Sequence, residues 1–428
     1  MDVRIEEEKT REKGSLKNSI GQYELADCKK KLQAMILERL DFSREAADEE
    51  IKDLIDELII AQSKELLIGI KDRGRLRQEL FHSIRKLDIL QELIDDAEVT
   101  EIMINGTDEI FIEKAGQIMG YGMRFESKEK LEDVIQRIAA GCNRTVNEAS
   151  PIVDARLENG SRVNVVLSPV ALNGPILTIR RFPDQAIGME ELKSFGSITE
   201  EADIFLKKLV KAKYNIFISG GTGSGKTTFL NALSAYIPQD ERIITIEDNA
   251  ELQIKDIPNL VRMETRNANV EGCKPIHIRD LIKTSLRMRP DRIIVGEVRG
   301  EEAIDMMQCL NTGHDGSMST GHANSSADML SRLETMILMG MELPLMAIRQ
   351  QIASGLDIII HLGRLRDKSR KVLEISEIEG MEGGEIKICP LYVFEESEKK
   401  NAKKVEGSLV KKGELRNVGK LKTAGITL

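Results

Sequence analysis

The sequence predicts an α/β protein in which a parallel sheet carries the functional centre and smaller domains precede it. Three observations support this fold class. First, an apolar strand, Tyr214 to Ser219, runs directly into a glycine-rich turn. Second, further apolar strands alternate with helical segments after that turn. Third, an amphipathic helix and short strands, in which apolar and polar residues alternate, precede the turn. At 428 residues the chain is too long for one hydrophobic core, which indicates two or three domains.

Composition excludes several classes of protein. Apolar residues make up 41% of the chain, and no apolar run approaches the roughly 18 to 20 residues that span a bilayer. The first residues are acidic and lack an apolar signal core, so we expect a cytoplasmic protein. A net charge of −9 with 4% aromatic residues argues against a nucleic-acid partner. Five cysteines are scattered without C-x-x-C spacing, so we expect no disulfide.

The N-terminal part is predicted to be helical. Residues 1–20 are charged and poor in apolar groups, so we expect them to be disordered. Residues 21–94 should form a small helical bundle, because two apolar stripes recur at helical spacing. The first stripe is Ile51, Leu54, Ile55, Leu58 and Ile59, and the second is Leu76, Leu80, Ile84, Leu87 and Leu90. The bundle either packs against its own neighbours or docks a partner.

A smaller α+β domain is predicted over residues 95–182. Asn105-Gly106 and Asn159-Gly160 are hairpin turns, and one helix with a single apolar face is expected between the two strand pairs. The expected strands are 101–104, 109–112, 152–157, 161–167 and 176–179, and the helix is 128–142. Residues 183–196 lack periodicity and are predicted to be a linker.

The main domain is predicted over residues 197–395. A capping box, Ser197-x-x-Glu200, should begin a helix that leads into the glycine-rich turn. Two later strands, 242–246 and 292–295, each end in carboxylates, and a hairpin follows over 372–378 and 385–394. Residues 396–428 are predicted to be a basic tail, with nine basic residues against two carboxylates between 399 and 422. That tail is either a solvated segment or one attracted to an anionic membrane or an acidic partner.

The glycine-rich turn has the pattern G-x-x-x-x-G-K-T, which is typical of a phosphate-binding loop. Its backbone N–H groups turn inward around phosphate oxygens, Lys226 supplies charge to the β and γ phosphates, and the Thr227 hydroxyl can ligate Mg²⁺. The position between a strand and a helix supports this interpretation. The predicted nucleotide-binding residues are Gly220, Gly221, Thr222, Gly223, Ser224, Gly225, Lys226, Thr227 and Thr228.

Acidic residues at the two strand ends are candidates for holding metal and water. Glu247, Asp248 and Glu251 follow one strand and Glu297 follows the other, so all should lie at the carboxyl edge of the sheet. We predict Glu297 and Glu247 as catalytic residues, and Thr227, Glu297 and Asp248 as metal ligands. Whether Glu247 or Glu297 orients the attacking water stays open at this point.

A third segment, residues 312–325, is dense in small polar residues and contains His314 and His322. Such a segment suits a sensor of the γ-phosphate, and His322 is our candidate. Two alternatives are a zinc site built from Cys309, His314, Asp315 and His322, and a plain loop. The remaining histidines, His82, His277 and His361, are isolated in the sequence and are assigned no function.

These motifs together resemble the type II/type IV secretion ATPase superfamily. The resemblance rests on the phosphate loop, the acidic box 245–251, the run 286–300 and the histidine-containing segment. Segments 104–106, 153–157, 160–164 and 178–182 resemble the branch that drives assembly of tight-adherence (Flp-type) pili, the CpaF/TadA ATPases. The similarity extends over residues from about 95 to 395. One departure from the general NTPase pattern is Gly296, where many NTPases place a metal-binding Asp.

The resemblance implies a RecA-like P-loop NTPase domain preceded by a smaller PAS-like domain, in a homo-hexameric ring that is peripheral to the cytoplasmic membrane. ATP and Mg²⁺ would bind between the two domains, with Arg162 and Arg180 reaching the γ-phosphate and Arg181 as a substitute; surface salt bridges are the alternative role for these arginines. The implied function is an ATP-hydrolysing motor that assembles, or also retracts, a pilus or secretion pseudopilus through inner-membrane platform proteins. The alternatives are a motor for DNA uptake or conjugation, and a nucleotide-gated scaffold with little hydrolysis.

Overall fold

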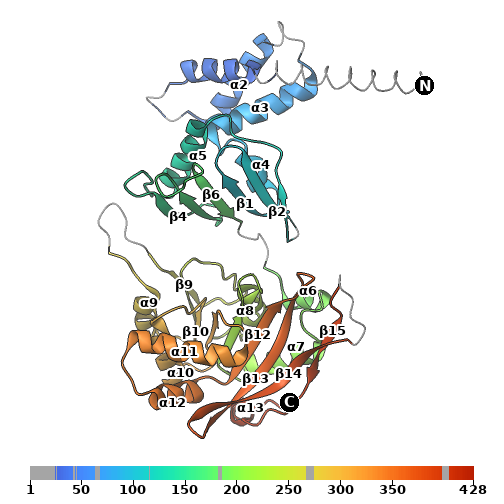
Figure 1. Ribbon diagram of the computed structural model, residues 1–428, viewed down its shortest axis with the longest axis vertical. Coiled ribbons are helices and arrows are strands. Elements are labelled where there is room, and N and C mark those ends of the chain that lie inside the picture. The colour runs from blue at the N-terminus through green and yellow to red at the C-terminus, as the bar shows by residue number, and fades with distance from the viewer. Residues whose placement is uncertain are drawn as a thin grey trace, which may run out of the picture. The chain divides into compact units, whose positions relative to one another are not determined.

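The computed structural model divides into two compact units, 1–183 and 184–428, which are described separately (Figure 1). The structure describes residues 25, 27–41, 44, 46–62, 68–114, 116–181, 186–266, 274–397 and 404–428. The segment expected to be disordered, residues 1–20, lies outside the described residues. In the described part of the chain no helix is both long and apolar enough to cross a membrane.

The first unit begins with packed helices. Residues 27–39 are helical, and α2 (Asp48–Gln62) and α3 (Ile70–Arg85) follow. The predicted stripes turn inward, because Ile51, Ile55 and Leu58 of α2 and Leu76 and Leu80 of α3 form one apolar core with the first helix. The last two residues of the second predicted stripe belong to the next core instead, where the short helix α4 (Leu90–Asp95) packs.

A six-stranded antiparallel sheet forms the rest of this unit, in the order β3-β2-β1-β6-β5-β4. The predicted helix is present as α5 (Lys128–Gly141), and Ser127 caps it by accepting a hydrogen bond from the Lys130 amide at 3.2 Å. Its apolar face packs on the sheet and closes the core. The strands are β1 (Val99–Asn105), β2 (Glu109–Lys114), β3 (Gln117–Gly120), β4 (Ile152–Arg156), β5 (Arg162–Val166) and β6 (Ile176–Arg180).

The second unit is built on a nine-stranded sheet in the order β15-β14-β13-β12-β7-β11-β10-β8-β9. The strands from β12 to β9 in this order run parallel, and β13, β14 and β15 extend the sheet in antiparallel fashion. The predicted α/β fold is confirmed. The strands are β7 (Ile216–Gly220), β8 (Ile243–Glu247), β9 (Leu260–Glu264), β10 (Arg292–Val295), β11 (Met318–Gly321), β12 (Ile358–Arg364), β13 (Arg370–Glu382), β14 (Glu385–Glu396) and β15 (Gly407–Lys411).

Helices cover both faces of the parallel part, which explains why its strands are apolar throughout. On β7, Ile216 and Ile218 join the core under α7 and α8, whereas Phe217 joins the opposite core under α9 to α12. Both faces of the strand that leads into the phosphate loop are therefore fixed by packing. The helices are α6 (Met189–Ser194), α7 (Glu200–Lys211), α8 (Lys226–Ser234), α9 (Ile278–Ser285), α10 (Glu302–Asn311), α11 (Ser326–Gly340), α12 (Leu345–Gly355) and α13 (Gly419–Thr423).

The segment predicted to be a linker, 183–196, contains the helix α6. Met189 and Leu192 of this helix are buried in the core of the second unit, and its six residues are too few to show a clear period in the sequence. The predicted helix start is also shifted. Thr199 caps α7 by accepting from the Ala202 amide, whereas the Ser197 hydroxyl donates to the Arg370 carbonyl at 2.7 Å.

The C-terminal segment predicted to be a basic tail, 396–428, is folded over its described residues 404–428. Strand β15 pairs with β14, and Leu409, Leu415 and Leu421 are buried in the core. Most of its bases have acidic partners in the same unit; Lys420, for example, lies 2.6 Å from carboxylate oxygens of both Asp315 and Asp357. The expectation of a solvated tail is therefore wrong for these residues, and the local excess of positive charge is largely neutralised within the fold.

Candidate active site

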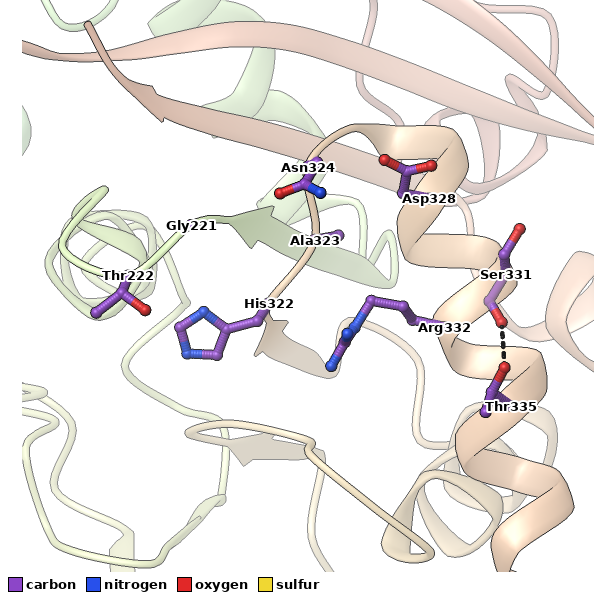
Figure 2. Close-up of a pocket in the computed structure, with 9 residues that line it drawn as sticks. All are labelled: Gly221, Thr222, His322, Ala323, Asn324, Asp328, Ser331, Arg332 and Thr335. Carbon is purple, nitrogen blue, oxygen red and sulfur yellow. Dashed lines mark hydrogen bonds between the residues drawn. The ribbon is translucent and has the colours of Figure 1, made fainter.

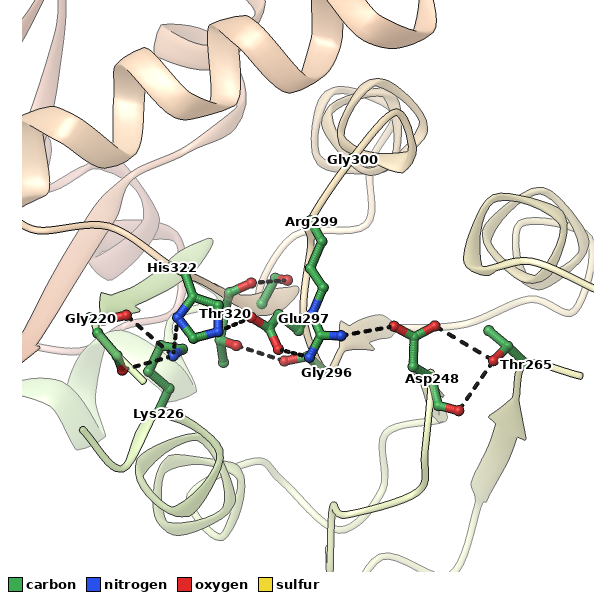
Figure 3. A network of polar contacts seen from close by, with 12 residues as sticks. Gly220, Lys226, Asp248, Thr265, Gly296, Glu297, Arg299, Gly300, Thr320 and His322 are labelled. Carbon is green, nitrogen blue, oxygen red and sulfur yellow. Dashed lines mark hydrogen bonds and ion pairs between the residues drawn. The ribbon is translucent and has the colours of Figure 1, made fainter. Parts of the chain in front are cut away.

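Four segments meet at the carboxyl edge of the parallel sheet. The phosphate loop follows β7, His322 follows β11, Glu297 follows β10, and Glu247 ends β8. These four strands are neighbours in the sheet and run parallel, so their ends lie along one edge, where ligands bind in open α/β folds. Figure 3 shows the polar contacts that connect Lys226, His322 and Glu297 with Asp248, the residue after Glu247.

The phosphate loop has the backbone that its glycines allow. Gly223 and Gly225 adopt φ values of 70° and 93°, in the left-handed region that glycine tolerates. Lys226 begins α8, and its ammonium donates hydrogen bonds to the carbonyls of Gly220 and Gly221 at 3.2 Å each. The Ser224 hydroxyl is buried and has no hydrogen-bond partner in the structure. An unsatisfied buried hydroxyl and an inward-facing ammonium fit a loop that takes phosphate oxygens.

A continuous run of polar contacts leads from this lysine to the strand-end acids. Lys226 Nζ lies 3.2 Å from His322 Nδ1, and His322 Nε2 lies 2.8 Å from Glu297 Oε1. Arg299 continues the run, because its guanidinium lies 2.6 Å from Glu297 Oε2 and 3.7 Å from Asp248 Oδ2. Burial, assisted by the Lys226 cation, lowers the pKa of His322, so the imidazole is neutral at pH 7. With Nδ1 accepting from Lys226, the proton of neutral His322 lies on Nε2 and faces Glu297.

Glu247, at the end of β8, is almost completely buried. One of its carboxylate oxygens accepts hydrogen bonds from the backbone amides of Glu251 and Leu252 at 2.7 and 2.9 Å, and the other has no partner. Burial raises the pKa of Glu247 to about 7. A Cβ atom on Gly296 would lie 2.9 Å from Glu247 Cγ, so the glycine is needed to make room for this side chain. That contact explains why no Asp stands at position 296.

The oxygen atoms at this edge fit Mg²⁺ bound together with a nucleotide. Thr227 lies half-buried in the first turn of α8, and Asp248 and Glu297 supply carboxylates that both contact the Arg299 guanidinium. Within the described residues no group of three or more acidic, His or Cys side chains could hold a metal on its own. Mg²⁺ in proteins commonly takes one or two carboxylates and completes its shell with water and substrate phosphates, which matches this set.

The structure does not assemble the zinc site considered as an alternative. His314 Nδ1 lies 3.3 Å from the Cys309 carbonyl, whereas His322 contacts Lys226 and Glu297. Asp315 is bound by Lys420. These four side chains therefore serve separate contacts.

Two residues that the sequence did not single out also support the loop. His361 on β12 is buried, its Nδ1 lies 2.9 Å from the Ser219 hydroxyl, and its ring hydrogen-bonds the backbone of Asn324. Arg370 Nε donates to the Gly223 carbonyl at 2.8 Å. His361, to which the sequence assigns no function, therefore has a structural contact, because this side chain joins the phosphate-loop strand to the segment that carries His322. No spacing in the sequence signals either contact.

The two arginines predicted to be catalytic lie in the first unit. Arg162 and Arg180 are register partners across β5 and β6, and Arg180 Nε lies 3.6 Å from Glu101. The guanidinium of Arg181 donates to backbone carbonyls, including that of Val99 at 3.4 Å. The roles of these arginines toward a nucleotide stay a prediction.

Comparison with known proteins identifies the family. The family model described as Type II/IV secretion system protein matches residues 84–408, about three quarters of the chain. The chain belongs to this family. Among its relatives, this secretion-family chain is 34% identical over 301 residues to a putative conjugal transfer protein of Mycobacterium tuberculosis, covering 69% of this chain and 85% of the relative. It is 33% identical to the conjugal transfer protein TrbB of Rhizobium radiobacter, with coverages of 73% and 93%.

Solved structures of similar proteins include the VirB11 ATPase from the Brucella suis type IV secretion system, at 28% identity and a TM-score of 0.37, covering 67% of this chain and 94% of that one. The pilus retraction motor PilT with bound ADP is 19% identical with a TM-score of 0.49, covering 79% and 87%. The second unit of this secretion-family protein is the RecA-like domain, and the first unit holds the smaller domain that precedes it.

Proposed function

We propose that this secretion-family protein hydrolyses ATP and works as a motor for assembling a pilus or secretion pseudopilus at the cytoplasmic face of a membrane. The observation that carries the proposal is the run Lys226–His322–Glu297, in which the lysine of the phosphate loop is joined through one neutral imidazole to a carboxylate two strands away. A protein that only binds nucleotide has no need for such a set of hydrolytic groups.

The side chains of the site have separable tasks. Lys226 provides charge to the β and γ phosphates, and neutral His322, which accepts from Lys226 through Nδ1, would sense the terminal phosphate through that lysine. Glu297, with one oxygen facing His322 and the other held by Arg299, is the acid best placed to orient the attacking water. Mg²⁺, held by Thr227, Asp248 and Glu297 with phosphate oxygens, would neutralise the charge that develops on the transferred group.

The finer features of the proposal follow from the sequence resemblance. We assign the chain to the CpaF/TadA branch, as a homo-hexameric ring whose substrate site is completed by Arg162 and Arg180 of the first unit. Hydrolysis would change the angle between the two units across residues 183–196, and inner-membrane platform proteins would receive the movement. Arg162 and Arg180 are register partners on the adjacent strands β5 and β6, so this sheet places two cations side by side. That position supports the proposed role of the two arginines toward the nucleotide.

A second candidate function is a motor for DNA transfer. The observation that favours it is that two of the relatives named above are described as conjugal transfer proteins. Neighbouring genes separate the two functions: a small pilin and polytopic platform proteins indicate a pilus, whereas a relaxase and mating-pair proteins indicate conjugation. Finding the latter set would replace the pilus assignment.

The central test is turnover by variants of the full-length protein. Lys226→Ala and Glu297→Gln should each abolish phosphate release, and Glu297→Gln should still bind a fluorescent ATP analogue, because the phosphate loop is intact. Glu301→Gln is the matched control, since Glu301 is an exposed acid four residues further on that pairs with Arg279. Adding membrane extract should raise turnover of a motor. Turnover near the wild-type rate in Glu297→Gln would assign the water-orienting role to Glu247 instead. If the wild type releases no phosphate, with or without membrane extract, the motor function is excluded and a nucleotide-gated scaffold is the remaining interpretation.

A further inference from the structure

A polar cavity extends from the phosphate loop to the outer helix α11. It has a volume of about 630 Å³, and Figure 2 shows its lining. The loop contributes Gly221 and Thr222, and the segment after β11 contributes His322 to Asn324. The helix contributes Asp328, Ser331, Arg332 and Thr335. Apart from Gly221 and Ala323, every lining residue has a polar side chain, so the cavity suits a hydrated polar ligand.

Arg332 is the cation of this cavity. In Figure 2 its side chain extends from α11 toward His322, and its charge contributes, after burial, Lys226 and Arg299, to lowering the pKa of His322. No carboxylate of the described residues forms an ion pair with Arg332, although Asp328 precedes it by one helical turn and lines the same cavity. An arginine without an ion pair, beside hydroxyl and amide groups, is the usual recognition chemistry for a phosphate-type anion.

The position of the cavity indicates which anion binds there. Its lining includes the second and third residues of the phosphate loop and His322, the group assigned to the terminal phosphate. Hydrolysis of ATP by water yields ADP and orthophosphate, and the orthophosphate forms at that end of the bound nucleotide. We propose, on the basis of the function assigned above, that this cavity is the site that receives orthophosphate after hydrolysis, with Arg332 as its binding cation.

The residues that line the cavity favour rapid release of orthophosphate over tight binding. The Thr335 hydroxyl already donates to the Ser331 carbonyl at 3.0 Å, so it offers an anion no proton without breaking that bond. The Asp328 carboxylate lines the same space and repels a dianion. Arg332 therefore carries most of the attraction, and removing its charge should remove most of the affinity.

The test measures binding of radiolabelled orthophosphate to the full-length protein loaded with ADP and Mg²⁺, so that the phosphate loop is already filled. Arg332→Gln should raise the dissociation constant for orthophosphate about tenfold or more, the factor that corresponds to losing one charged hydrogen-bonding group. Arg332→Lys keeps the charge and should fall between wild type and Arg332→Gln. Arg287→Gln is the matched control, because Arg287 is exposed and has no ion pair in the described structure. Equal thermal unfolding temperatures would show that the variants are folded.

Two outcomes overturn the inference: wild type that shows no saturable binding of orthophosphate, or Arg332→Gln that binds it as tightly as wild type. Neither of these binding measurements requires the protein to hydrolyse ATP. Failure of the proposed function is seen separately, as absence of phosphate release from ATP by the wild type, and it leaves the orthophosphate measurement interpretable.

Discussion

The buried carboxyl of Glu247 should make the stability of the second unit depend on pH. Its pKa is about 7 in the folded protein and near 4.5 in an unfolded chain, because burial disfavours the charged form. Between these values the folded protein keeps a proton that the unfolded chain has lost. The stabilising contribution of the neutral carboxyl is therefore complete below pH 4.5 and is lost as the pH rises through 7.

The size of this effect follows from the two pKa values. Ionising the folded carboxyl at high pH costs about 3 kcal/mol relative to the unfolded chain, and the change between pH 5 and pH 8 is about 2.5 kcal/mol. Glu247→Gln removes the titration while leaving an oxygen for the amides of Glu251 and Leu252. Relative to wild type, this variant should gain about 2.5 kcal/mol in free energy of unfolding between pH 5 and pH 8.

Urea unfolding in EDTA without nucleotide, at pH 5, 6, 7 and 8, measures this difference. The signal should report the second unit, for example through a fluorophore attached near α8, because the two units need not unfold together. Glu301→Gln is the control, since Glu301 is an exposed acid of the same unit that pairs with Arg279 and is not among the groups that shift the pKa of Glu247. A difference between wild type and Glu247→Gln that stays constant within about 0.5 kcal/mol across this pH range would refute the reasoning.

Three further predictions follow from contacts at the edges of the sheet. Gly296→Ala should destabilise the protein by about 1 to 3 kcal/mol in thermal unfolding and reduce ATP turnover, because its Cβ would overlap Glu247; unchanged unfolding would show that the carboxyl moves aside easily. Lys420→Met should lower the unfolding temperature and increase proteolysis of the C-terminal segment, since it leaves the half-buried Asp357 without its cation; equal cleavage rates would contradict this. Arg292→Met should lower the free energy of unfolding, measured by chemical denaturation, by about 3 to 5 kcal/mol. The reason is that the Glu241 carboxylate, which pairs with the fully buried Arg292 guanidinium, would lose its partner. A decrease below about 1 kcal/mol would mean that water reaches the pair.

The parts of the site that the sequence predicts are those defined by local patterns and by parallel strand direction. The phosphate loop is a contiguous motif, so its strand, turn and helix are visible directly. Glu247 and Glu297 come at the ends of short apolar strands, whereas His322 follows β11, a strand of mostly small polar residues that no sequence pattern predicts as a strand. Once the strands are parallel neighbours, these groups must come to one edge, as the structure shows.

The parts that could not be predicted depend on pairings between distant segments. His361 meets Ser219 only because β12 is the neighbour of β7, a pairing that joins residues 142 positions apart. Lys420 on the C-terminal helix α13 donates to Asp357, just before β12, across 63 positions of the chain. The short helix α6 and the folded C-terminal segment were missed because five- or six-residue elements carry too little periodicity, and because counting charges does not show which acids neutralise them.

The strand β7 is held by polar groups from both of its neighbours. From β11, His322 contacts Lys226 inside the loop; from β12, His361 contacts Ser219 just before the loop and also binds the backbone of Asn324, two residues after His322. Burial lowers the pKa of both histidines, so at pH 7 both act as neutral hydrogen-bonding groups. The loop and the His322 segment are therefore joined at two points. A displacement of His322 by a phosphate must either carry Asn324 and the start of α11 with it or break the bond to His361, which couples the chemical site to the helix that lines the cavity.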